Sequence, residues 1–80
     1  MNNEEIRKTV SVNIKAVREH LGLTKRQLAD KVGVSYKQVN VWESAKAIPS
    51  AEKLSELCKL ANLPLFALYM KNMVEEFYDE

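Results

Sequence analysis

The 80-residue sequence has a single cysteine, Cys58, and a single histidine, His20. One cysteine cannot form an intramolecular disulfide, and with one histidine it does not supply the ligand clusters that bind zinc. No set of nucleophile, base and orienting residue can be recognised either. We therefore expect no enzymatic activity, no metal and no cofactor, and we interpret Cys58 as a core residue and His20 as a surface helix residue.

Long hydrophobic runs are also missing. No segment approaches the roughly 18 apolar residues that span a bilayer, and the polar first five residues lack the basic and then apolar pattern of a signal peptide. Apolar residues still make up 46% of the chain and charged residues 29%, a balance typical of folded globular chains. We expect one domain over residues 1–80, in the cytoplasm.

Neither sign of charge dominates, because the formal net charge is only +1. The distribution is uneven, however. Residues 15–46 contain seven bases and three acids, whereas the last six residues contain four acids, Glu75, Glu76, Asp79 and Glu80. A basic middle segment attracts phosphate even when the total charge is small. On charge alone, ordinary surface lysines and a solvated tail explain the pattern equally well.

Glycine and proline are scarce, with two of each, and each falls at an expected helix boundary. A first helix runs towards Leu21 and ends at Gly22, where a left-handed cap is favoured. Thr24 with Gln27 has the spacing of a capping box and begins a second helix that ends before Gly33. The sequence therefore predicts two helices in its first 33 residues.

Three further helices are expected. Ser35 and Gln38 repeat the capping-box spacing and begin a third helix through about Ser44, and Ser50 caps a fourth. Pro64 suits the first turn of a fifth helix, whose apolar stripe continues almost to the C-terminus. Helical spacing assigns the following residues to the core of the first four helices: Val10, Ile14, Val17, Leu21, Leu28, Ala29, Val32, Val39, Trp42, Leu54, Leu57, Cys58 and Ala61.

The segment from Leu21 to Ser44 resembles the helix-turn-helix of the phage repressor and Cro family, also called XRE-type regulators. The matching features, at the family's spacing, are Leu23-Thr24, Leu28-Ala29, Gly33-Val34-Ser35, Val39, Trp42-Glu43, Lys46 and Pro49-Ser50. The resemblance covers about residues 10–69. It implies an all-α, five-helix domain of the lambda-repressor type, with the motif at about 24–44 and a helical C-terminal extension at about 70–80.

In this family the second helix of the motif enters the major groove of DNA. The resemblance assigns base reading to the outward positions Tyr36, Lys37, Asn40 and Val41. Lys37 can donate to guanine, Asn40 can pair with adenine or hold a phosphate, Val41 can pack on a thymine methyl, and Tyr36 can contact a base or a phosphate. The alternative for each is an ordinary solvent-facing side chain.

The resemblance also implies contacts to the DNA backbone, from Lys25, Ser35, Gln38, Ser44 and Lys46. Lys25 stands where the family usually has glutamine, so affinity should depend more strongly on salt.

Two further positions bear on the shape of the motif. Ala45 stands where the family commonly has glycine, and we expect a modified turn there. Arg18 and Glu43 occupy positions that related proteins join by an ion pair, and we expect them to touch.

The apolar stripe of the extension needs something to cover it. Its main residues are Phe66, Met70, Met73, Val74 and Phe77. Three interpretations are open: the tail folds back on the first helix, it forms a homodimer interface, or it binds another protein. A dimer would allow two recognition helices to read half-sites one helical turn apart.

The function that the resemblance implies is a sequence-specific, double-stranded DNA-binding regulator of transcription, a bacterial or phage repressor that occupies operator DNA. The alternative is a protein-interaction module of the same fold that binds a repressor, a toxin or another effector. Salt dependence distinguishes the two, since contacts to phosphate release counterions and weaken steeply as salt rises.

Overall fold

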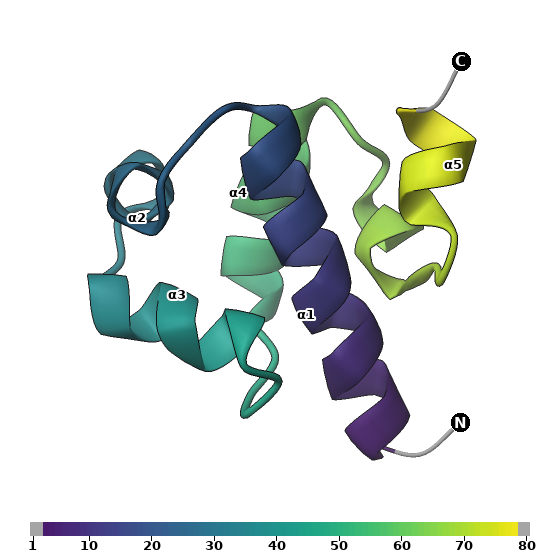
Figure 1. The fold of residues 1–80 in the computed structure, drawn as a ribbon, viewed down its shortest axis with the longest axis horizontal. Coiled ribbons are helices and arrows are strands. Elements are labelled where there is room, and N and C mark those ends of the chain that lie inside the picture. Colours follow the sequence, from purple (N-terminus) through teal and green to yellow (C-terminus); the bar gives the residue numbers. More distant parts are fainter. Residues whose placement is uncertain (1–2, 79–80) are drawn as a thin grey trace.

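A computed structural model describes residues 3–78, whose regular secondary structure is entirely helical. The helices are α1 (Asn3–His20), α2 (Lys25–Val32), α3 (Tyr36–Glu43), α4 (Ala51–Ala61) and α5 (Met73–Phe77), with a 3₁₀ helix, η1 (Leu65–Tyr69), before α5. In Figure 1, α1 runs through the middle, with α2 and α3 on one side and η1 and α5 on the other. The predicted all-α, five-helix fold is confirmed. None of the helices described is long and apolar enough to cross a membrane.

The core forms from the apolar stripes that helical spacing predicts. All thirteen predicted core residues are buried except Leu21, which is half-buried and packs against the others. Ala67, Leu68 and Met73 from the C-terminal segments complete the cluster. Helix α1 contacts α3, η1 and α5, so it positions both the third helix and the C-terminal segments.

The helix caps explain where α2, α3 and α4 begin. At α2 both hydrogen bonds of the capping box are present, between Thr24 and Gln27. At α3 only one is present: the Gln38 amide donates to Ser35 Oγ at 3.1 Å, so the second capping box predicted from the sequence is half-formed. Ser50 Oγ accepts from the Lys53 amide, as expected of an N-cap.

The turn between α2 and α3 is built around Gly33, whose φ of 70° lies in the left-handed region. A side chain is strained in this conformation, so glycine suits the position. The Val34 amide donates to the Ala29 carbonyl at 3.0 Å, which closes the end of α2. Lys53 Nζ donates to the Val32 carbonyl at 2.8 Å and so ties the same end to α4.

The C-terminal segment differs from the continuous fifth helix that the sequence predicts. It is broken between η1 and α5, and Met70 has an extended backbone, with φ −92° and ψ 127°. The buried side-chain amide of Asn13 stabilises the break, because its Nδ2 donates to the carbonyls of Leu68 and Met70, each at 2.8 Å. In a continuous helix those carbonyls would accept backbone amides four residues on.

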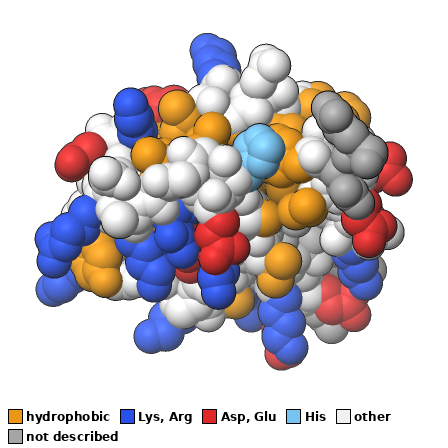
Figure 2. Space-filling model, turned by 45° about the horizontal axis from the view of Figure 1, so that its top comes forward, with side chains coloured by type: hydrophobic (Ala, Val, Ile, Leu, Met, Phe, Trp, Pro, Cys, Tyr) orange, Lys and Arg blue, Asp and Glu red, His pale blue; other side chains and the backbone are white. Residues whose placement is uncertain are grey.

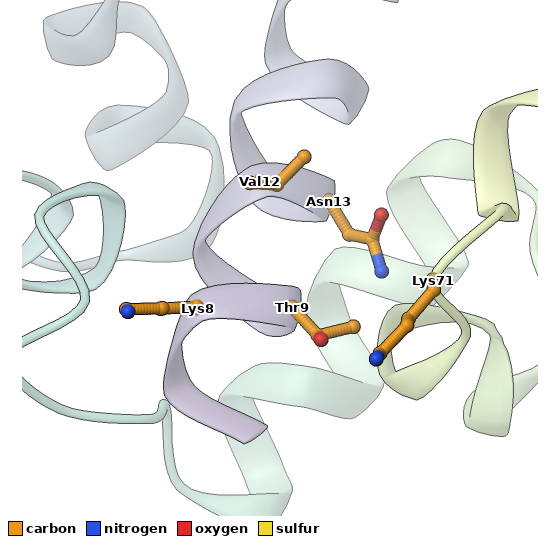
Figure 3. Close-up of a pocket in the computed structure, with 5 residues that line it drawn as sticks. All are labelled: Lys8, Thr9, Val12, Asn13 and Lys71. Atoms are coloured by element: carbon orange, nitrogen blue, oxygen red, sulfur yellow. The ribbon is translucent and has the colours of Figure 1, made fainter. Parts of the chain in front are cut away.

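Asn13 lies on the side of α1 away from α2 and α3, and Figure 3 shows its amide directed at the segment that carries Lys71. A cavity of about 220 Å³ opens beside it, lined by Lys8, Thr9, Val12, Asn13 and Lys71. Asn13 was not among the predicted core residues, although a polar residue three positions after Val10 on the buried face of α1 signals such a contact.

Candidate nucleic-acid interface

Helix α3 has a buried back and an exposed front. Val39 and Trp42 are 0% and 2% exposed and hold the back of the helix in the core. Tyr36, 38% exposed, and Lys37 lie on the front, at the N-terminal end of the helix. Successive residues of an α-helix are turned by about 100°, so Tyr36, Lys37, Asn40 and Val41 share one broad face. The arrangement leaves the start of α3 accessible from outside the domain.

Asn40 and Val41 are less exposed than the sequence analysis assumed. Both are half-buried, and Val41 packs against the hydrophobic core. The reason is geometric, because Val41 lies at the edge of the front face, about 100° from the buried Trp42. Part of its side chain is therefore engaged in packing, and only the remainder can contact a base.

Arg18 and Glu43 form the ion pair expected from the resemblance. Arg18 Nε donates to Glu43 Oε2 at 2.8 Å and Nη2 to Oε1 at 3.1 Å, a bidentate geometry. The two side chains are only 13% and 4% exposed, and the hydrogen bond to Glu43 raises the pKa of Arg18 further. Arg18 Nη1 also donates to the Leu23 carbonyl at 3.0 Å. One guanidinium thus joins α1, the turn before α2 and the end of α3.

A second contact between α1 and the end of α3 comes from Ser11, which the sequence analysis did not identify. Its hydroxyl donates to the Glu43 carbonyl at 2.7 Å, and Ser11 is only 7% exposed. This carbonyl belongs to the last turn of α3, where backbone acceptors lack partners within the helix. Side chain and backbone of Glu43 are therefore both anchored to α1, which fixes the direction of α3.

The first turn of α2 contacts the front of α3. Lys25 Nζ donates to Asn40 Oδ1 at 2.9 Å, and the Arg26 guanidinium carbon lies 4.5 Å from the centre of the Tyr36 ring. Arg26 was not among the residues that the sequence pattern singled out. No spacing rule joins it to Tyr36, because the contact depends on the angle between the two helices.

The residues expected at the DNA backbone differ in what they can donate. Ser35 Oγ accepts from Gln38 and retains its own hydrogen for a phosphate. The Ser44 hydroxyl already donates to the Asn40 carbonyl at 2.7 Å. Lys46 is exposed in the loop after α3, whereas Gln38 is half-buried. Ser35 and Lys46 are thus better placed than Gln38 and Ser44 to donate to a phosphate.

Ala45 overturns the expectation of a modified turn after α3. Its φ is 62°, the left-handed conformation that glycine adopts readily, and the Lys46 amide donates to the Val41 carbonyl at 3.1 Å. The turn therefore keeps the usual left-handed geometry, with a side chain in a position that disfavours one.

Basic and acidic side chains are unevenly distributed over the surface (Figure 2). Figure 2 shows several Lys and Arg side chains on the side formed by α2 and α3, and acidic side chains beside the C-terminal segment. Glu75 and Glu76 lie in the first turn of α5, where a helix favours acids. Asp79 and Glu80 lie outside the described residues. Helices α2 and α3 carry Lys25, Arg26, Lys31 and Lys37, and basic side chains of this kind favour anions at the surface that they form.

The tail residues do not form one surface. Met73 is fully buried, so it belongs to the core and not to an exposed interface, and Met70 is half-buried. Phe66, Val74 and Phe77 are 61%, 41% and 39% exposed. The break before α5 accounts for this difference, because it turns Met73 inward.

The end of the described chain is also held against α1. The rings of His20 and Tyr78 stack 3.7 Å apart. The tail therefore lies on α1, and its exposed apolar side chains lie on either side of the break.

Two helices joined by a tight glycine turn, the second with a buried back and an exposed, cation-flanked front, define a DNA-binding domain of the helix-turn-helix class. The family described as helix-turn-helix, of the Cro and C1 type, matches residues 14–68, more than half of the chain. The chain belongs to this XRE-type family of DNA-binding regulators. Comparisons with curated proteins and with solved structures gave no match.

Proposed function

We propose that the protein is a sequence-specific regulator of transcription that binds double-stranded DNA with α3 in the major groove. The observation that carries the proposal is the front of α3, where Tyr36 and Lys37 face outward from a helix anchored by buried Val39 and Trp42. A reading helix must be held rigidly, because hydrogen bonds to base edges tolerate little misplacement. The Arg18–Glu43 pair supplies part of that rigidity.

The chemistry of the front face supports direct reading of bases. Lys37 donates to guanine O6 or N7, and Asn40 pairs with adenine through its amide. The exposed part of Val41 packs on a thymine methyl, and Tyr36 contacts a base or a phosphate. Because Lys37 is the only cation within α3, most of the attraction to phosphate comes from Lys25, Lys46 and their neighbours.

We further propose that the protein acts as a bacterial or phage repressor, in the cytoplasm, by occupying operator DNA. This role involves no chemical step. Two copies bound to half-sites one helical turn apart, about 34 Å, would bind more tightly than one. The exposed Leu65 and Phe66, 60% and 61%, support a homodimer.

The same exposed residues support a second candidate function, in which the domain binds a repressor, a toxin or another effector protein. An apolar protein interface would show little dependence on salt, whereas each phosphate contact lowers log K by about 0.9 per unit of log salt. The two functions are therefore separated by one titration series.

The test is selection of bound sequences from random duplex DNA, followed by affinity measurements on the selected site between 50 and 200 mM salt. Lys37→Ala should cost about 1–3 kcal/mol on that site and relax the preference at one base pair. Lys46→Ala should weaken binding equally on all sequences.

Lys15→Ala is the control, because Lys15 is an exposed cation on α1, outside the motif. If Lys15→Ala relaxed the preference at the same base pair as Lys37→Ala, the result would argue against base reading by α3. If the protein selects no sequence and its binding does not respond to salt, the proposal of DNA reading is wrong.

A further inference from the structure

The first turn of α2 carries charges of the sign that a helix start disfavours. The N-terminus of a helix has a positive partial charge, which favours acids. The first turn of α2 contains no acid but two consecutive bases, Lys25 and Arg26. A local preference that is violated in this way points to a role for these side chains outside their own helix.

Both bases contact side chains on the front of α3. Lys25 Nζ bonds to Asn40 Oδ1 at 2.9 Å, and the Arg26 guanidinium lies over the Tyr36 ring at 4.5 Å. Tyr36 and Asn40 are four residues apart and therefore lie one above the other on one side of α3. Two adjacent residues of α2 thus hold two neighbouring residues of the face that, on the proposed function, reads bases.

The Arg26 contact can set the orientation of Tyr36 without blocking it. A guanidinium that lies over an aromatic ring uses its flat face, so the N–H groups at its edge stay available. Tyr36 remains 38% exposed. A tyrosine already held in one rotamer loses less conformational freedom when it meets a base. Arg26 is itself exposed and can donate to a phosphate at the same time.

We propose that Arg26 is a specificity-determining positioning residue, which presets the Tyr36 ring for base reading and links its position to a neighbouring phosphate. The proposal rests on the proposed function, since it assumes that α3 reads bases. It goes beyond that function by adding α2 to the determinants of sequence preference. The sequence preference at the base pair read by Tyr36 therefore depends on a residue outside α3.

The test is a double-mutant cycle of Arg26→Gln and Tyr36→Leu in the full chain. Binding is measured on the selected duplex, on its single base-pair variants and on a random duplex. Tyr36→Leu identifies the base pair whose preference Tyr36 determines. Arg26→Gln should lower the preference at that base pair by about two- to five-fold, the strength of a cation–π contact at an exposed site. In the Tyr36→Leu background it should have no further effect on preference.

Lys31→Gln is the matched control. It removes one positive charge from the same helix, and the described part of the chain shows no hydrogen bond or ion pair from Lys31 to α3. Arg26→Gln should reduce the slope of log K against log salt, because it removes a phosphate contact, and it should change the base preference. Lys31→Gln should leave the base preference unchanged. Circular dichroism of each variant checks that the fold is retained, as expected for two exposed residues.

Two outcomes would overturn the proposal: Arg26→Gln weakens binding equally on every duplex, or its effect on preference adds to that of Tyr36→Leu. Either result would make Arg26 a phosphate contact only. If the unmodified protein shows no sequence preference at all, the failure lies with the proposed function itself. The two failures are therefore distinguishable.

Discussion

Replacing Ala45 by glycine should stabilise the protein. Ala45 has a φ of 62° in the turn just after α3, and an L-residue in the left-handed conformation costs roughly 1–2 kcal/mol. Glycine avoids that cost but adds conformational freedom to the unfolded chain, which offsets about 0.4–1 kcal/mol. We therefore expect Ala45→Gly to raise the free energy of unfolding by about 0.5–1 kcal/mol. For a domain of this size the melting temperature should rise by about 2–8 °C.

Urea unfolding followed by the fluorescence of Trp42 measures the change, because this buried tryptophan is the only one in the chain. Ala47→Gly is the matched control in the same loop, since the φ of Ala47 is not positive. There the substitution should lower the free energy of unfolding by about 0.4–1 kcal/mol. Equal effects of the two substitutions, or no gain from Ala45→Gly, would refute the reasoning from backbone conformation.

Three other predictions concern the ion pair, pH and salt. Glu43→Gln leaves the half-buried Arg18 without a charged partner and should cost about 1.5–3 kcal/mol of stability, measured by thermal unfolding; an unchanged melting temperature would show that the pair does not anchor α3. Burial raises the pKa of Cys58 and of Tyr78, so the unfolded chain releases these protons first as pH rises. The free energy of unfolding should therefore fall from about pH 9 upward, and a flat profile of urea midpoints to pH 10.5 would contradict this. Lys25→Gln, which restores the residue common in the family, should reduce the slope of log K against log salt by about 0.9. A slope equal to that of the unmodified protein would mean that Lys25 bonds to Asn40 alone.

The sequence by itself was sufficient to predict where α1 to α4 lie along the chain. Spacing of apolar residues depends only on the period of the helix, and caps such as Thr24 and Ser50 act within three residues. Gly33 is equally local, because its conformational freedom belongs to the residue itself. The family resemblance added the Arg18–Glu43 pair, which no local rule predicts.

Tertiary structure alone decided the rest. The break before α5 depends on Asn13, which is 55 and 57 residues away from the carbonyls it binds, and it sends Met73 into the core. The left-handed turn at Ala45 persists without glycine, because packing on both sides outweighs a local strain of about 1–2 kcal/mol. The contact of Arg26 with Tyr36 exists only because α2 and α3 cross at one particular angle. A sequence pattern specifies which face of a helix is buried, but the partners of its exposed side chains follow from how the helices pack.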